Sequence, residues 1–190
     1  MLIHNRTFAL VIAASLGLLA CRSGADTTAD PAPSEQSQGE RQARARMMSA
    51  AGEHLGEITF TRTAQGVRVQ GQVAGLEGNG ARGFHVHEFG QCDPPDFQSA
   101  GGHFNPHGHP HGGPDHQPGA RHVGDFGNIE VDDEGNAQPD FIDPIIALEA
   151  GLNNIIGHAL IIHAEEDDLQ TQPTGDAGAR AACGIIELVE

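Results

Sequence analysis

The sequence has no lysine, no tryptophan and no tyrosine, and only three of its 190 residues are cysteine. Without lysine, all ten basic residues are arginine, and 26 acidic residues give a formal net charge of -16. So acidic a chain is a poor partner for nucleic acid or for an anionic membrane surface, and we exclude both. The sequence also lacks a sustained helical stripe of apolar residues and an internal repeat of about 20 to 50 residues, which excludes helical bundles, solenoids and propellers.

Glycine and histidine are the residues that the sequence has in excess. With 26 glycines, 11 prolines and eight phenylalanines as the only aromatic residues, the composition favours a turn-rich β protein. A chain of 190 residues can bury a substantial core without help from metals or disulfides. The twelve histidines therefore have no packing explanation and indicate chemistry that uses imidazole.

The first twenty residues predict an export signal. Arg6 precedes an apolar run at residues 8–20, which is shorter than the roughly 20 residues of a membrane-spanning helix. The run ends in Leu-Leu-Ala-Cys at residues 18–21, which resembles the lipobox of bacterial lipoproteins, where the cysteine is lipidated and becomes the first mature residue. We therefore predict a lipoprotein signal peptide at 1–20 and a membrane anchor at Cys21. The alternative is an ordinary signal peptide cleaved nearby.

The next segment predicts a disordered tether that ends at residue 52. Residues 22–52 contain almost no large apolar side chain, so they cannot bury enough surface to offset the entropy lost on ordering. The charge also changes at this boundary, because residues 1–52 hold five arginines and four acidic residues, whereas residues 53–190 hold five arginines and 22 acidic residues. We therefore predict a lipidated cysteine and tether at 21–52 and a folded domain at 53–190.

Within that domain, apolar and polar residues alternate with the period of half-buried strands. The apolar runs that predict strands lie at 58–60, 67–73, 84–86, 128–131, 145–146, 159–162 and 184–189. Short strands separated by turn signals are typical of an antiparallel sandwich or barrel. The stretch from Gly90 to Gly127 is too long for an ordinary connection, and long ordered loops usually carry function.

Many of the histidines are placed where they could bind metal. His85 and His87 lie two apart on a predicted strand, so both rings project from the face opposite Phe84 and Val86. The long loop adds His103, His107, His109, His111, His116 and His122, followed by Asp125. A buried imidazole at His163, at the end of an apolar run, needs a hydrogen-bond partner or a metal. Imidazole and carboxylate suit zinc or copper. The alternatives for the loop are nonspecific metal scavenging and a solvated surface.

Six sequence blocks resemble one known family. They are GFHVHEFG at 83–90, GHFNP at 102–106, HGGP at 111–114, RHVGD at 121–125, His163 and GDAGARAACG at 175–184. Their order is similar to that in copper/zinc superoxide dismutases, and the resemblance spans nearly all of 54–190. It implies an all-β, Greek-key antiparallel β-sandwich or flattened barrel with long metal-binding loops. It also implies dismutation of superoxide to dioxygen and hydrogen peroxide, in the cell envelope if the export signal is right.

The resemblance implies a role for individual residues and a cofactor content of one copper and one zinc ion per subunit. The implied copper ligands are His85, His87, His103 and His163, and the implied zinc ligands are His103, His111, His122 and Asp125. His103 would bridge the two metals and act in catalysis with Arg180, which would guide superoxide.

Two further features follow from the same resemblance. Asp167 would hydrogen-bond to one ligand of each metal. Cys92 and Cys183 would form a disulfide, which suits an oxidising compartment, and closing so large a loop would stabilise the fold by about 4 to 5 kcal/mol.

The chain departs from the eukaryotic cytosolic members in its loops. Residues 93–100 form a longer stretch and residues 169–179 a shorter one, so we carry over neither their dimer nor their charged guiding cluster, and we predict no oligomeric state. His107, His109 and His116 are extra, and we hypothesise that they help to recruit metal.

The main alternative function is an envelope lipoprotein that buffers or delivers copper or zinc on the same fold. Such a protein would need no arginine to position an anion, which makes Arg180 the discriminating residue. A copper-only relative would lack His111, His122 and Asp125, and a purely structural sandwich would need none of these side chains.

Overall fold

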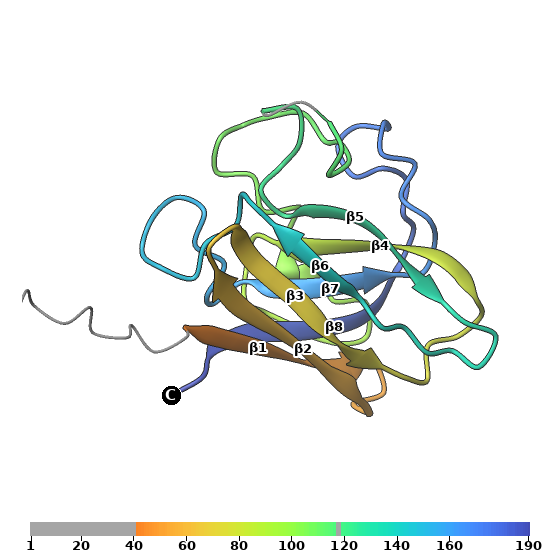
Figure 1. Ribbon diagram of the computed structural model, residues 1–190. Coiled ribbons are helices and arrows are strands. Elements are labelled where there is room, and N and C mark those ends of the chain that lie inside the picture. The colour runs from red at the N-terminus through yellow and green to blue at the C-terminus, as the bar shows by residue number, and fades with distance from the viewer. Residues whose placement is uncertain (1–40, 117–118) are drawn as a thin grey trace, which may run out of the picture. The chain divides into compact units, whose positions relative to one another are not determined.

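The computed structural model describes residues 41–116 and 119–190, which form an antiparallel β fold (Figure 1). The strands are β1 (Gln42–Ser49), β2 (His54–Thr63), β3 (Gly66–Val73), β4 (Gly80–His87), β5 (Asp125–Val131), β6 (Asp140–Asp143), β7 (Ala159–His163) and β8 (Arg180–Leu188). Among the described residues the only helical element is the 3-10 turn η1 (Gln98–Ala100). No helix in these two ranges is long and apolar enough to cross a membrane.

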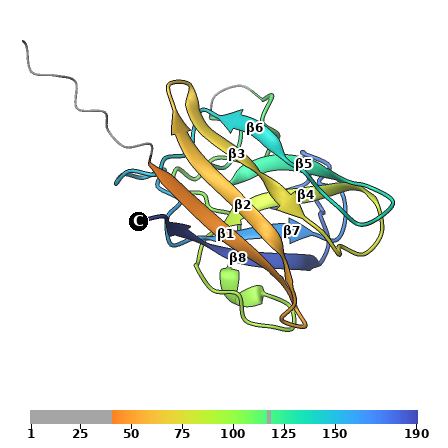
Figure 2. The same cartoon turned by 60° about the horizontal axis from the view of Figure 1, so that its bottom comes forward.

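The eight strands form one curled sheet in the order β5-β4-β7-β8-β1-β2-β3-β6. Figures 1 and 2 show that the half made of β5, β4, β7 and β8 packs over the half made of β1, β2, β3 and β6. The chain crosses between the halves after β3, after β5 and after β6, which confirms the predicted all-β Greek-key flattened barrel. Each half buries one face against the other.

Alternation along β4 and β7 separates the core from the site. Phe84 and Val86 on β4 and Leu160 and Ile162 on β7 point into the main core. The intervening side chains point to the opposite face, which the long β4–β5 loop covers. On that face Ile161 packs in a second apolar cluster, whose other members are Phe97, Ala100, Ala159 and Cys183, with Cys92 against it. The predicted disulfide between Cys92 and Cys183 is present and ties the loop to β8.

The tether predicted to end at residue 52 is too long, because β1 occupies residues 42–49. Ala43, Ala45 and Met47 are fully buried in the main core, and β1 hydrogen-bonds to β2 on one side and to β8 on the other. The alternation was present in the sequence, but two of its three buried residues are alanines, which contribute little hydrophobicity. The folded domain therefore begins at or before residue 41, and residues 1–40 lie outside the described residues.

Replacing Met47 with alanine should test whether β1 is an integral part of the core. The fully buried side chain would leave a cavity, so we expect the free energy of unfolding to fall by about 2 to 5 kcal/mol in urea denaturation. Met48 is the matched control, because it is only partly buried and points to the other face, and Met48→Ala should cost about 1 kcal/mol or less. Equal losses in the two variants would contradict the placement of β1.

The strand predicted at 145–146 is also wrong, since β6 ends at Asp143. The Asp143 carboxylate accepts the backbone N–H groups of Ile145 and Ile146, and Pro144 has no N–H to give to a ladder. The chain therefore turns here, although Ile146 is still buried in the core. The remaining predicted strands are confirmed, with bounds that differ by a few residues.

Candidate metal centre

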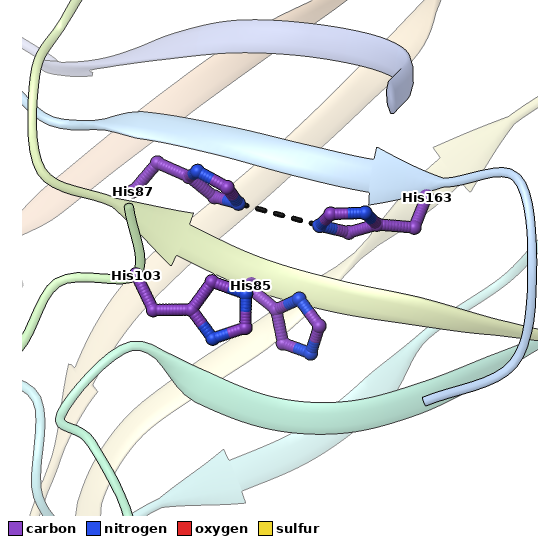
Figure 3. Close-up of side chains that lie close together, drawn as sticks. All are labelled: His85, His87, His103 and His163. Atoms are coloured by element: carbon purple, nitrogen blue, oxygen red, sulfur yellow. Dashed lines mark hydrogen bonds between the residues drawn. The ribbon is translucent and has the colours of Figure 1, made fainter. Parts of the chain in front are cut away.

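Four buried histidines converge on the outer face of β4 and β7 (Figure 3). His85 and His87 project from β4, His163 ends β7, and His103 comes from the loop, which pairs beside β4 at His87. One ring nitrogen from each residue lies within 4.8 Å of the others. The Nε2 atoms of His87 and His163 are only 3.3 Å apart. Four imidazoles at this spacing can hold one metal ion.

The four rings are neutral, as metal-binding imidazoles must be, and in the described chain two of them have a ring nitrogen without a hydrogen-bond partner. Burial lowers the pKa of His103 to about 4 and that of His163 to about 3, with neighbouring histidines adding to the effect. Among the described residues, His85 Nδ1 and His103 Nε2 are buried without a hydrogen-bond partner. Each such orphan costs about 1 to 3 kcal/mol, and a cation between them would satisfy both.

A second group lies beside the first and shares His103. It contains His103, His111, His122 and Asp125, all buried, with one ligand atom each within 4.8 Å. Around Asp125 at the start of β5, Oδ1 lies 2.7 Å from His103 Nδ1 and 3.2 Å from His122 Nδ1, and Oδ2 lies 3.0 Å from His111 Nδ1. Three imidazoles and one carboxylate are a closed tetrahedral donor set.

The charges of the second group also fit a bound cation. Burial would lower the pKa of His111, but the carboxylates of Asp125 and Asp167 raise it to about 9, so the ring carries a proton in the metal-free protein. Burial would raise the pKa of Asp125, but hydrogen bonds with His103, His111 and His122 hold it well below its usual range. His111 Nδ1 lies 3.0 Å from Asp125 Oδ2 but is not aligned for a hydrogen bond with it, and a metal there would replace the positive charge.

Asp167 connects the two groups. Its Oδ2 lies 2.7 Å from His85 Nε2 and its Oδ1 lies 2.9 Å from His111 Nε2. Because the Nε2 atom of each ring is used by this carboxylate, the Nδ1 atoms are left for metal, and these are two of the three orphaned nitrogens. Asp167 thus joins one histidine of each group through hydrogen bonds.

Arg121 and Asp143 are functional neighbours to which sequence reasoning gave no role. The buried Arg121 guanidinium pairs with Asp143 and donates to the backbone carbonyls of His122 and Asp125. It therefore fixes the backbone of two members of the second group. An arginine directly before the predicted ligand His122 was the available signal, but its partner Asp143 lies 22 residues away and becomes visible only in the fold.

Arg180 stands at the start of β8, paired in register with His163. A cavity of about 430 Å³ is lined by both residues. The half-buried guanidinium donates to the backbone carbonyls of Phe97 and Gly101 in the long loop. Burial lowers the pKa of Arg180 from its ordinary value, with nearby Asp96 opposing the shift, and an arginine stays charged at neutral pH. The residue is therefore both a cation beside the first group and an anchor for the loop.

The remaining predicted positions lie elsewhere. His107, His109 and His116 are on the surface of the loop and belong to neither four-residue group. His158, which the sequence analysis did not single out, hydrogen-bonds to the carbonyl of Glu88 and packs on Phe104. Cys21 lies outside the described residues.

Comparison with known proteins gives consistent matches. The family model described as copper/zinc superoxide dismutase matches residues 54–186. The Cu-Zn superoxide dismutase 1 of Aquifex aeolicus is 39% identical over 78% of this chain and 89% of its own length. The Cu-Zn superoxide dismutase of Schizosaccharomyces pombe is 45% identical over 70% of this chain and 89% of its own length. The crystal structure of a double mutant of an SOD-like protein from Bacillus subtilis aligns with a TM-score of 0.69 and 36% identity, covering 74% of this chain and 94% of that one.

Proposed function

Since the chain belongs to the copper/zinc superoxide dismutase family and dismutes superoxide with one copper and one zinc ion per subunit, we propose which of its residues hold each metal. His85, His87, His103 and His163 hold copper, and His103, His111, His122 and Asp125 hold zinc. The observation that carries this assignment is the shared His103, whose Nδ1 lies 2.7 Å from Asp125 while its buried Nε2 has no partner among the described residues.

The donor types support this division. Three histidines and an aspartate around one point match the closed tetrahedral coordination of a structural zinc ion, which has no redox chemistry. The other set is made of imidazoles alone, which suit copper, and one of its members, His163, lines the same cavity as Arg180. Access for substrate is therefore needed only at the all-imidazole set.

In the mechanism, bound copper supplies the one-electron chemistry by which one superoxide becomes dioxygen and a second becomes peroxide with uptake of two protons. The protein positions the metal and the substrate and supplies the local electric field. Arg180 offers fixed N–H donors and a permanent positive charge to the small anion, in a chain whose net charge is -16. His103 can hold one of the protons at Nε2 and pass it to peroxide, because its Nδ1 faces the zinc set beside Asp125 and leaves Nε2 without a partner among the described residues.

We further propose that the protein acts outside the cytoplasm, in the cell envelope. Residues 1–20 would be a lipoprotein signal peptide, Cys21 would carry the lipid, and the tether would end near residue 40, where the described fold begins. The disulfide supports this compartment, because disulfides are rare where thiols are kept reduced. The Haemonchus contortus relative, 42% identical, is named an extracellular superoxide dismutase.

The central test is the rate of superoxide decay by the full chain loaded with copper and zinc. We expect a near-diffusional rate constant that falls as salt screens the guiding charge. A slow rate with both metals bound in stoichiometric amount would instead favour the alternative, an envelope protein that buffers or delivers metal.

Replacing Cys21 with serine should test the anchor. In the host cell, the parent protein is expected in the membrane fraction and to carry a lipid visible by mass spectrometry, whereas Cys21→Ser should be released in soluble form. Copper and zinc content should be the same in both, since residue 21 precedes the fold. An equal distribution of both forms would contradict lipidation at this residue.

A further inference from the structure

The backbone of His111 is held differently from the backbones of the other three members of the second group. Of those three, one pairs beside β4, one begins β5, and one has its carbonyl held by Arg121. His111 lies in an irregular part of the long loop between β4 and β5. Among the described residues, its backbone N–H and carbonyl have a single hydrogen-bond partner, the side chain of Gln172.

The Gln172 side chain hydrogen-bonds to His111 in both directions. Its Oε1 accepts the His111 N–H at 2.8 Å, and its Nε2 donates to the His111 carbonyl at 2.9 Å. The same Nε2 also donates to the carbonyl of Gln170 at 3.2 Å. Turning the amide over would place N–H against N–H and oxygen against oxygen, so these partners fix its orientation. Gln172 therefore ties the backbone of His111 to a second loop.

The ring of His111 is held by the same second loop, residues 167–175. At its start, the Oδ1 atom of Asp167 lies 2.9 Å from His111 Nε2. At its end, Gly175 has a φ of +66°, and a Cβ there would overlap the Asp167 carboxylate and the His111 ring. With the backbone and Nε2 both held, the Nδ1 atom of His111 is left beside Asp125, 3.0 Å from its Oδ2.

The segment 167–175 has a defined turn of its own. The Asp168 carboxylate accepts the backbone N–H groups of Gln170 at 2.9 Å and of Thr171 at 2.7 Å. Hydrogen bonds from a side chain to nearby backbone order a loop that has neither helix nor strand. This turn directly precedes Gln172 and positions its side chain against the second group.

We propose that Gln172 is a positioning residue for the second group, which tightens zinc binding by fixing the backbone of His111. A ligand that is already in place loses less conformational freedom when the metal binds, and this increases the affinity. The proposal rests on the proposed function, since it takes the second group as the zinc site. His111 is not a member of the first group, so the effect should be confined to zinc.

The test replaces Gln172 with methionine in the full chain. Methionine is also long and unbranched but has no N–H to donate, and residue 172 is exposed, so the change leaves the core intact. In competition with a chelator of known zinc affinity, we expect the zinc affinity to fall about tenfold or more, while copper content stays that of the parent. Gln170→Ala is the matched control, because only backbone atoms of Gln170 take part in hydrogen bonds of the described chain, and it should bind zinc as the parent does.

A second readout separates positioning from a general loss of stability. Co²⁺ bound in place of zinc has visible absorption bands that report the arrangement of its donors. In Gln172→Met these bands should shift or weaken, because the His111 donor is no longer held in place. In Gln170→Ala they should match those of the parent.

Three results would overturn the positioning role: zinc affinity equal to that of the parent in Gln172→Met, weaker binding with an unchanged Co²⁺ spectrum, or an equal loss of affinity in Gln170→Ala. His122→Gln identifies a failure of the proposed function itself. If that variant keeps its zinc, the second group is not the zinc site and both proposals are wrong. If it loses zinc while Gln172→Met binds zinc as the parent does, only the positioning role is wrong.

Discussion

Replacing Arg180 with glutamate is expected to slow superoxide dismutation by about tenfold or more at low ionic strength. The substrate is an anion, the chain has a net charge of -16, and Arg180 lines the same cavity as His163 and pairs with it in register. Reversing its charge removes the local attraction that brings superoxide to the copper set. The measurement is the decay rate of superoxide as a function of salt, and the difference between variant and parent should shrink as salt rises.

The structure shows that this variant needs controls, because Arg180 also holds the loop through the carbonyls of Phe97 and Gly101. Arg180→Lys keeps the charge and loses the fork of donors, whereas Arg180→Gln keeps an N–H donor and loses the charge. If the charge guides substrate, the lysine variant should be the faster of the two, with copper and zinc content unchanged in both. Equal rates for Arg180→Glu and the parent at low salt would reject the guiding role.

The sequence predicted the strands wherever large apolar side chains alternate with polar ones. The pattern at residues 84–87 correctly placed two histidines opposite two core residues, because strand period alone decides that arrangement. β1 was missed because alanines supply two of its three buried positions. This segment forms a strand because it hydrogen-bonds to β2 and to β8, and β8 lies at the other end of the chain. Such pairing is a tertiary effect that local composition does not report.

The family resemblance could name the residues of the two metal groups, but it could not say which ring nitrogen of each histidine is left for the metal. Asp167 occupies one nitrogen each of His85 and His111 and thereby decides which nitrogen is left for metal. Likewise Asp143, on another strand, pairs with Arg121, which donates to the backbone carbonyls of His122 and Asp125. These distinctions depend on hydrogen bonds between distant segments, so only the fold reveals them.

Replacing His163 with glutamine is expected to remove copper while zinc stays bound, and dismutation should fall to background. His163 contributes to the all-imidazole group only, and the other group keeps its four members. The loss should exceed the roughly 10- to 100-fold reduction in metal affinity that follows when only a ligand's hydrogen-bond partner is changed. Elemental analysis after dialysis gives both metals in one sample, and the superoxide assay gives the activity.

The reciprocal variant tests the second group. His122→Gln removes a member of the second group only, so zinc should be lost while copper is retained with much of the activity. The two groups share only His103, so the two variants should produce opposite metal contents if each group holds its own ion. Loss of both metals from either variant while it remains folded, as judged by urea denaturation, would mean that the groups act as one binding unit and that the separate assignment is wrong.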